Sequence, residues 1–268
     1  MKLGISSYSY TWAVGVPGHL PALRLNEMDL LSRAAELDVK LIQIADNMPL
    51  HEMSEERIEN LVKKSGELGI EIEAGAKGMT PERLQKYIGI ARKVKSGILR
   101  FVVDGDDFRP GVDEIISIIR DAEPDLRESN IILAIENHDR LFTYQFVRIM
   151  DSVASDYVGI CLDCANSLGV GEGIHEVVNS LAPYAVNFHL KEVSIKRKYH
   201  KMGFDIEGRP FGEGDLPLGW MLGKLPEKCR TAIFEQWTPP EESLEKTLEK
   251  EKLWAVKSIS YLRDYFKY

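Results

Sequence analysis

Four apolar segments in the second half of the chain each end in an ionisable residue of a kind that binds metal ions. The run 131–135 contains no Gly or Pro and leads directly into Glu136. Three later segments end in the same way, and the four residues are Glu136, Asp163, His189 and Glu235. A charge at the end of a buried strand is costly unless a cation or hydrogen bonds compensate it. Each residue therefore requires a partner.

Three carboxylates and one imidazole gathered together would favour a single divalent cation. An oxygen-rich set of this kind suits Mn²⁺ or Mg²⁺, with Co²⁺ or Zn²⁺ possible, better than it suits a structural zinc, which favours thiolates. Each residue also has an ordinary explanation: a glutamate at a strand end can form a salt bridge, His189 can be a satisfied polar residue, and Asp163 can cap a helix. Four such residues in succession favour a shared metal.

Strand-like and helix-like segments alternate along the whole chain. Eight strands in 268 residues predict one (β/α)8 TIM-barrel domain over residues 1–268. Active sites of such barrels lie at the C-terminal ends of the strands, where the four residues would meet. A doubly wound open sheet is the main alternative, but no Gly-x-Gly-x-x-Gly turn follows the first strand. The predicted strands are 2–8, 40–45, 70–74, 98–103, 131–136, 158–162, 185–190 and 231–234.

Sequence signals also predict details of the connecting segments. Pro124 is expected to kink or end the helix that begins near Asp113. Residues 191–219 are predicted to form a long loop, part of which could fold over the substrate as a lid. The closing helix is expected over about 241–265.

Composition and charge exclude several classes of protein. The net charge is −8 and the isoelectric point is about 5.4, whereas nucleic-acid binding relies on clustered Lys and Arg. No apolar run approaches the roughly 18 residues that span a bilayer, and the first residues lack a signal peptide. Three cysteines are too few for a disulfide framework. We expect a cytoplasmic protein with no nucleic-acid or membrane partner.

Five short motifs resemble those of the xylose isomerase-like TIM barrels. This family contains sugar isomerases, 3-epimerases, inosose dehydratase and, more distantly, apurinic endonucleases. The resemblance covers nearly the whole chain in order. The motifs are Ala134-Ile135-Glu136-Asn137-His138, Leu162-Asp163-Cys164-Ala165-Asn166-Ser167, Phe188-His189-Leu190-Lys191-Glu192, Gly212-Glu213-Gly214-Asp215 and Phe234-Glu235.

The resemblance implies one metal ion, held by the four strand-end residues, that binds adjacent oxygens of a keto-sugar or keto-polyol. A cation bridging a carbonyl and the neighbouring hydroxyl acidifies the intervening C–H bond, because it stabilises the ene-diolate that forms on deprotonation. In epimerase members the two metal-bound glutamates are also the acid and the base. The resemblance therefore implies these roles for Glu136 and Glu235.

The chain departs from the epimerase pattern at three positions around the metal ligands. Epimerase members carry a second glutamate, a histidine and an arginine where this chain has Phe142, Asn166 and Ile195. A simple hexulose 3-epimerase is therefore not favoured. Asn166, His138 and Arg209 are candidates for contacting the substrate in place of these epimerase residues. His138 could instead orient a metal ligand or be an exposed loop residue.

Three further residues are expected near the substrate. Lys191 lies two residues after His189 and would stabilise negative charge that develops during catalysis, or else form a surface salt bridge. Tyr8 and Trp12 follow the first strand, where they would form an apolar wall for a sugar or cap the barrel core.

The residues together favour a metal-dependent isomerase or epimerase that acts on a small carbohydrate through an ene-diolate. The alternative is a lyase or dehydratase acting on a keto-polyol or 3-keto-glycoside, which shares the first half of that chemistry. An abasic-site endonuclease is disfavoured by the acidic charge. Such relatives use several metal ions and need more histidines at the rim, whereas this chain has only six in all. A purely carbohydrate-binding barrel gains no support from the intact ligand set, and a homo-oligomer is possible.

Overall fold

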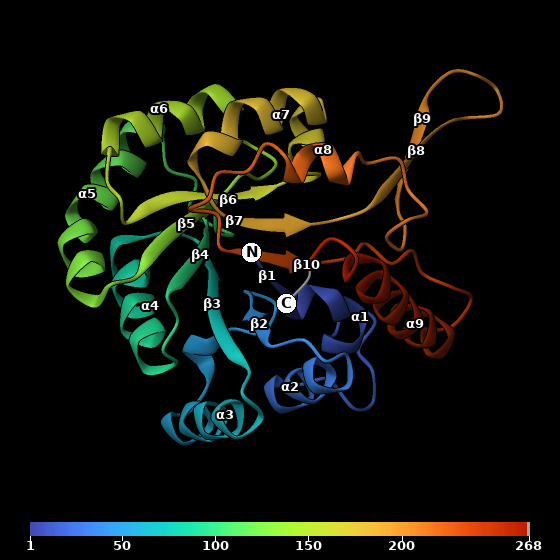
Figure 1. The fold of residues 1–268 in the computed structure, drawn as a ribbon, viewed down its shortest axis with the longest axis horizontal. Coiled ribbons are helices and arrows are strands. Elements are labelled where there is room, and N and C mark those ends of the chain that lie inside the picture. The colour runs from blue at the N-terminus through green and yellow to red at the C-terminus, as the bar shows by residue number, and fades with distance from the viewer. Residues whose placement is uncertain (267–268) are drawn as a thin grey trace.

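The computed structural model describes residues 1–266, and within them eight parallel strands close into a barrel (Figure 1). The order around the barrel is β1-β10-β7-β6-β5-β4-β3-β2, so the predicted (β/α)8 fold is confirmed. The barrel strands are β1 (Lys2–Ser6), β2 (Leu41–Ile44), β3 (Glu71–Lys77), β4 (Ile98–Val102), β5 (Ile132–Glu136), β6 (Val158–Asp163), β7 (Ala185–Leu190) and β10 (Thr231–Phe234).

Helices surround the barrel and cover its outer face (Figure 1). Their apolar sides pack on the strands, as the helical periodicity of the sequence predicts. The helices are α1 (Thr11–Val14), α2 (Glu27–Glu36), α3 (Glu55–Leu68), α4 (Pro81–Lys93), α5 (Val112–Ser129), α6 (Thr143–Val153), α7 (Ile174–Leu181), α8 (Leu218–Leu222) and α9 (Leu244–Leu262).

Local capping explains several of the helix boundaries. The Asn26 side chain accepts hydrogen bonds from the first turn of α2, and Asp29 Oδ2 accepts one from the Asn26 backbone N–H. Thr80 caps α4, with Pro81 at the first helical position, where its missing N–H costs nothing. Gly69 ends α3 in the left-handed conformation, with φ of 62°. These short-range signals were all present in the sequence.

Pro124 does not end α5, which runs to Ser129. The proline lies on the exposed side of the helix, so the carbonyl that it leaves unbonded can be hydrated. The apolar side, with Ile119, Ala122 and Leu126, stays buried. The expectation that Pro124 could end the helix is therefore wrong, because burial of this face outweighs the loss of one helical hydrogen bond; the alternative, a kink at Pro124, stays a prediction.

The predicted long loop 191–219 contains an antiparallel hairpin made of β8 (Val193–Arg197) and β9 (Phe204–Gly208). This hairpin projects away from the barrel body in Figure 1. Its strands alternate apolar and polar residues, a strand signal that the dense charge of the segment obscured. Within residues 1–266, no helix is long and apolar enough to cross a membrane.

The lumen of the barrel contains polar residues as well as apolar ones. Gln43, Glu73, Arg100 and Asn187 come from four different strands and are each 4% exposed or less. Buried groups of this kind persist where they hydrogen-bond one another. They form the floor beneath the C-terminal rim, where the four predicted metal ligands lie.

Candidate metal centre and active-site pocket

The four strand-end residues converge on one point at the C-terminal rim of the barrel. His189 Nδ1 lies 3.6 Å from Glu136 Oε2, 3.7 Å from Asp163 Oδ2 and 3.5 Å from Glu235 Oε1. The four residues are at most 2% exposed. Neighbouring parallel strands produce this convergence, since Asp163 pairs in register with His189. The predicted clustering is thus present in the structure.

The atoms at this point are arranged as a metal site would be. Among residues 1–266, buried atoms without a hydrogen-bond partner include Asp163 Oδ2, His189 Nδ1 and Glu235 Oε1. Asp163 Oδ2 has an ion-pair contact with Lys191, but not in hydrogen-bond geometry. Buried polar atoms rarely remain unpaired, and a cation bound between these three atoms would satisfy them. Their oxygen and nitrogen donors fit a divalent ion.

Lys191 lies beside the metal centre and contacts two of the proposed ligands. Its Nζ is 2.6 Å from Asp163 Oδ2 and 3.1 Å from Glu235 Oε2, and it donates to Asn166 Oδ1 at 3.0 Å. Burial alone would lower the pKa of this amine, but the neighbouring carboxylates outweigh burial and raise the pKa. Nζ also lies 5.3 Å from the centre of the Trp237 ring. Lys191 is therefore a charged ammonium held inside the site.

The same balance keeps the carboxylates ionised. Burial would raise the pKa of the Asp163 carboxyl, but Lys191 and His189 more than offset it, so the pKa is lowered. Glu235 shows the same outcome, with burial opposed by His189, Lys191 and Arg100. Ionised carboxylates are the form that a metal ion requires of its ligands.

Arg100 is a site residue that the sequence analysis missed. Its Nε donates to Glu136 Oε2, and its Nη1 donates to Asp46 Oδ1 at 2.6 Å. Tyr8 OH donates to the other oxygen of Asp46 at 2.9 Å. The available signal was a charged residue in the middle of an otherwise apolar strand, Ile98-Leu99-Arg100-Phe101-Val102. Such a residue has to face the lumen and be paired.

Both oxygens of Glu136 are occupied by hydrogen-bond donors. Arg100 takes Oε2, and Asn166 Nδ2 donates to Oε1 at 2.8 Å. Donors of this kind hold a carboxylate in one orientation. The Glu136 carboxylate is therefore fixed in place from both sides.

The charged side chains around the four strand-end residues carry an excess of negative charge that one divalent cation would neutralise. Among residues 1–266, the carboxylates in direct contact with Arg100, Lys191 or His189 are Asp46, Glu136, Asp163 and Glu235, and the cations among them are Arg100 and Lys191. Four negative and two positive charges leave an excess of two negative charges. A divalent ion would neutralise this excess, which agrees with the unpaired atoms that face it.

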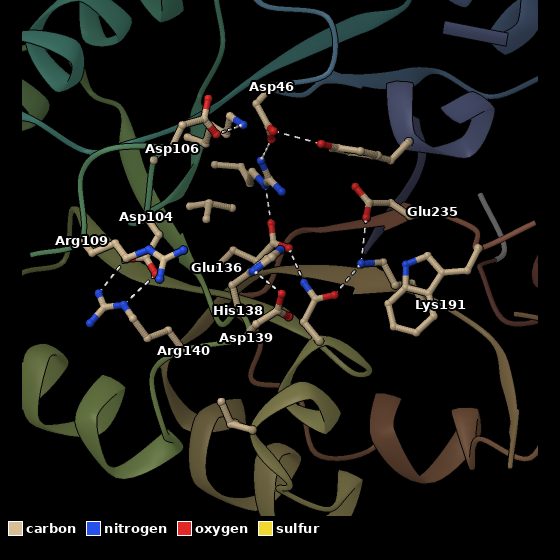
Figure 2. Close-up of a pocket in the computed structure, with 18 of the residues that line it drawn as sticks. Asp46, Asp104, Asp106, Arg109, Glu136, His138, Asp139, Arg140, Lys191 and Glu235 are labelled. Carbon is tan, nitrogen blue, oxygen red and sulfur yellow. Dashed lines mark hydrogen bonds and ion pairs between the residues drawn. The ribbon is translucent and has the colours of Figure 1, made fainter. Parts of the chain in front are cut away.

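A cavity of about 900 Å³ opens above the metal centre. Figure 2 shows Lys191 and Glu235 on one side of it and Arg109 and Arg140 on the other. Arg140 is held in a bidentate pair by Asp104, with distances of 2.6 and 2.7 Å. The cavity is large enough for a small carbohydrate and its displaced water.

The structure places most of the sequence-predicted site residues at this cavity. Six of them line it: Tyr8, Glu136, His138, Asn166, Lys191 and Glu235. Asp163 and His189 lie in its floor and are fully buried. Phe142, where epimerases carry their second glutamate, also lines the cavity. The substrate contacts proposed for Tyr8, His138 and Asn166 stay predictions.

Two predicted substrate residues are not brought to this cavity. Trp12 lies in α1, donates from Nε1 to the Thr238 carbonyl at 2.8 Å and lines a separate hollow. Arg209 is tied to the hairpin through Ser194 Oγ and Glu207 Oε2. For both residues the expected position at the substrate is corrected.

The chain is similar to proteins of known family and activity. A family model described as "Xylose isomerase-like TIM barrel" matches residues 31–265. A 3-oxo-isoapionate decarboxylase from Pectobacterium atrosepticum is 28% identical over 266 residues, which cover 98% of this chain and 95% of that protein.

Solved structures with the same fold are more distant in sequence. A D-psicose 3-epimerase, solved in the presence of D-fructose, has a TM-score of 0.71 at 15% identity and covers 98% of this chain and 99% of its own. A protein named IOLI with a bound zinc atom has a TM-score of 0.69 at 14% identity, with full coverage of both chains. At this identity the likeness concerns the fold alone.

Proposed function

The chain belongs to the xylose isomerase-like TIM barrel family, and from this premise we propose that it is a divalent-metal-dependent lyase that decarboxylates a 3-oxo sugar acid. The observation that carries the proposal is the occupation of both Glu136 oxygens by Arg100 and Asn166. Epimerisation needs a free base to remove a proton, whereas loss of CO₂ from a 3-oxo acid needs none. The similarity to a 3-oxo-isoapionate decarboxylase supports the same choice.

Decarboxylation requires a group that accepts the electron pair of the broken carbon–carbon bond. In a 2-hydroxy-3-oxo acid, the bond between the carboxyl carbon and its neighbour breaks and CO₂ leaves. The electron pair passes to the neighbouring carbon and the 3-oxo oxygen, which gives an ene-diolate. A divalent ion bound to the cluster Glu136, Asp163, His189 and Glu235 would supply a Lewis acid for the substrate oxygens.

Lys191 completes the reaction as a proton donor and as an electrostatic partner of the oxyanion. Its ammonium faces the cavity between Asp163 and Glu235, so it lies next to any oxygen held at the metal centre. Preorganised charges of this kind stabilise negative charge that develops in the transition state. The ammonium then gives a proton to the carbon that lost CO₂ and takes one back from solvent.

Arg100 and Asn166 act as positioning residues in this scheme. They hold Glu136 in place, and Arg100 is in turn held by Asp46. A fixed carboxylate ligand holds the ion, and the substrate oxygens with it, in one orientation. Both residues reach the cavity surface, so they also contribute to its shape.

An isomerase or epimerase, as expected from the sequence, remains the second candidate. It is favoured by the second glutamate, because Glu235 Oε1 has no hydrogen-bond partner within residues 1–266. Glu235 would then remove the proton and an ene-diolate would form in the same place. The two candidates differ in whether the product retains the carbon of the carboxyl group.

The test is an assay of purified protein, with and without added Mn²⁺ or Mg²⁺, against 3-oxo sugar acids and neutral keto-sugars. The proposal predicts metal-dependent products that have lost the mass of CO₂ and that carry one deuterium when made in deuterium oxide. Products of unchanged mass from neutral keto-sugars would establish the isomerase instead. The metal-free protein and Glu235→Gln are the controls for contaminating activity.

A further inference from the structure

The two ring nitrogens of His189 face different surroundings. Nδ1 faces the three carboxylates of the metal centre. Nε2 points into the barrel lumen and lies 2.8 Å from Gln43 Oε1. An amide oxygen only accepts hydrogen bonds, so Nε2 has to carry a proton in this contact. That leaves Nδ1 as the nitrogen available to a metal ion.

The orientation of the Gln43 amide is fixed from below by Glu73. Gln43 Nε2 donates to Glu73 Oε2 at 3.0 Å. If the amide were turned over, its oxygen would face Glu73 and its NH₂ group would face His189. Burial raises the pKa of the Glu73 carboxyl to about 7, so above this pH the carboxylate is ionised and the contact would be repulsive. The acceptor at Glu73 therefore sets the direction of both hydrogen bonds above it.

Glu73 is itself held by the wall of the barrel. Asn187 Nδ2 donates to the same Glu73 oxygen at 3.1 Å and lies 2.7 Å from Thr231 Oγ1. Glu73, Gln43 and Asn187 are 4% exposed or less, so water does not compete for these bonds. β2, β3, β7 and β10 thus contribute to one buried chain that ends at His189.

We propose that Glu73 and Gln43 are positioning residues that select Nδ1 of His189 as the metal-binding nitrogen. The acceptor carboxylate of Glu73 orients the Gln43 amide, Gln43 accepts from Nε2–H, and the imidazole is held with Nδ1 toward the other ligands. Partners behind a ligating histidine fix its tautomer and its ring orientation in this way. The inference concerns metal binding and does not depend on which reaction follows.

Gln43→Leu tests the proposal because it removes the acceptor and keeps the side chain bulky. Titration calorimetry of the metal-free protein with Mn²⁺ or Zn²⁺ should show affinity about 10- to 100-fold weaker than wild type. Thr247→Val is the control, since it removes a buried hydroxyl whose hydrogen bonds lie at the start of α9, outside the chain that ends at His189, and it should bind metal as the wild type does. Wild-type affinity in a folded Gln43→Leu protein would overturn the proposal.

Nitrogen NMR of the zinc-loaded protein reports which ring nitrogen of His189 binds the metal. A purely structural role of Gln43 and Glu73 would not determine this choice. In the wild type the His189 ring should show a proton on Nε2 and the metal on Nδ1; the metal on Nε2 would overturn the proposal even if no variant folds. The double variant Gln43→Glu with Glu73→Gln exchanges acceptor and donor at constant charge. The double variant should restore the metal affinity that Gln43→Leu loses. A double variant that binds metal as weakly as Gln43→Leu would contradict the proposed roles of Glu73 and Gln43.

Discussion

Lys191 Nζ lies 2.6 Å from Asp163 Oδ2, within the set of atoms that would hold the metal ion. The same ammonium contacts Glu235 and Asn166 and lines the cavity. A cation in this position competes with the metal for the carboxylates, so it is an unfavourable neighbour for metal binding alone. We propose that Lys191 is kept there for a role toward the substrate.

Replacing the lysine should therefore separate catalysis from metal binding. We predict that Lys191→Met lowers kcat about 10²- to 10⁴-fold, because a positioned proton donor is lost. Metal affinity should be kept or increased, since one competing charge is removed. Rates and calorimetric titrations measured together check this. Lys250→Met is the matched control, because Lys250 also lies over a tryptophan ring, that of Trp254, but outside the cavity.

A loss of metal affinity in Lys191→Met would contradict this interpretation and make the lysine a structural part of the ligand set. Unchanged kcat would contradict it as well.

Arg100 should be important for stability as well as for the position of Glu136. Arg100→Leu leaves Asp46 and Glu136 buried without their main cation. We predict a loss of about 3–5 kcal/mol in the free energy of unfolding of the metal-free protein, measured with urea at neutral pH. Arg148→Leu, which removes an exposed pair with Asp113, should cost roughly 0–1 kcal/mol. Equal effects of the two changes would show that the buried network contributes little.

The convergence of the four strand-end residues could be predicted from the sequence because its signal is local. Each ligand directly follows an apolar run, and the barrel rule places all strand ends on one rim. Arg100 and Gln43 were missed because both lie inside strands that are buried on both faces. For such strands the sequence does not reveal which residues face the lumen and which face the helices.

Trp12 and Arg209 were wrongly placed at the substrate for a different reason. Their positions depend on how irregular segments fold, not on strand ends. Trp12 lies in the short helix α1, and Arg209 directly follows β9, which pairs with β8. Tyr8, four residues before Trp12, lies two residues after β1 and lines the cavity, and its contact with the substrate stays a prediction.

Metal binding should stabilise the folded protein measurably. Free metal at 100 times its dissociation constant contributes about 2.7 kcal/mol, which corresponds to a Tm rise of about 5–10 °C for a chain of this size. Asp163→Asn should abolish the rise while keeping the Oδ1 contacts with the Ala165 and Asn166 amides. His138→Ala should retain the rise, because His138 lines the cavity without facing the metal centre. An equal rise in Asp163→Asn would place the metal elsewhere.

Glu251 should make stability depend on pH. Burial raises the pKa of its carboxyl to about 7, although the Trp12 and Ala13 amides donate to it. Between about pH 4.5 and 7 the folded chain therefore binds more protons here than the unfolded chain does, so stability falls as pH rises.

Relative to Glu251→Gln, the metal-free wild type should lose up to about 3 kcal/mol of unfolding free energy between about pH 4.5 and 8. Urea unfolding of both proteins across this range checks the prediction. Glu245→Gln, at an exposed site near the start of α9, is the control and should give a curve parallel to that of the wild type. Parallel curves for Glu251→Gln would contradict the assignment.

The central claim is that the site removes CO₂ from a 3-oxo sugar acid. The most direct measurement follows a 3-oxo sugar acid labelled with carbon-13 in its carboxyl group by NMR, with the metal-loaded protein. We predict that the label appears as carbon dioxide and bicarbonate at a rate that depends on the metal and on Lys191. Turnover in which the label stays in the sugar product would contradict the claim.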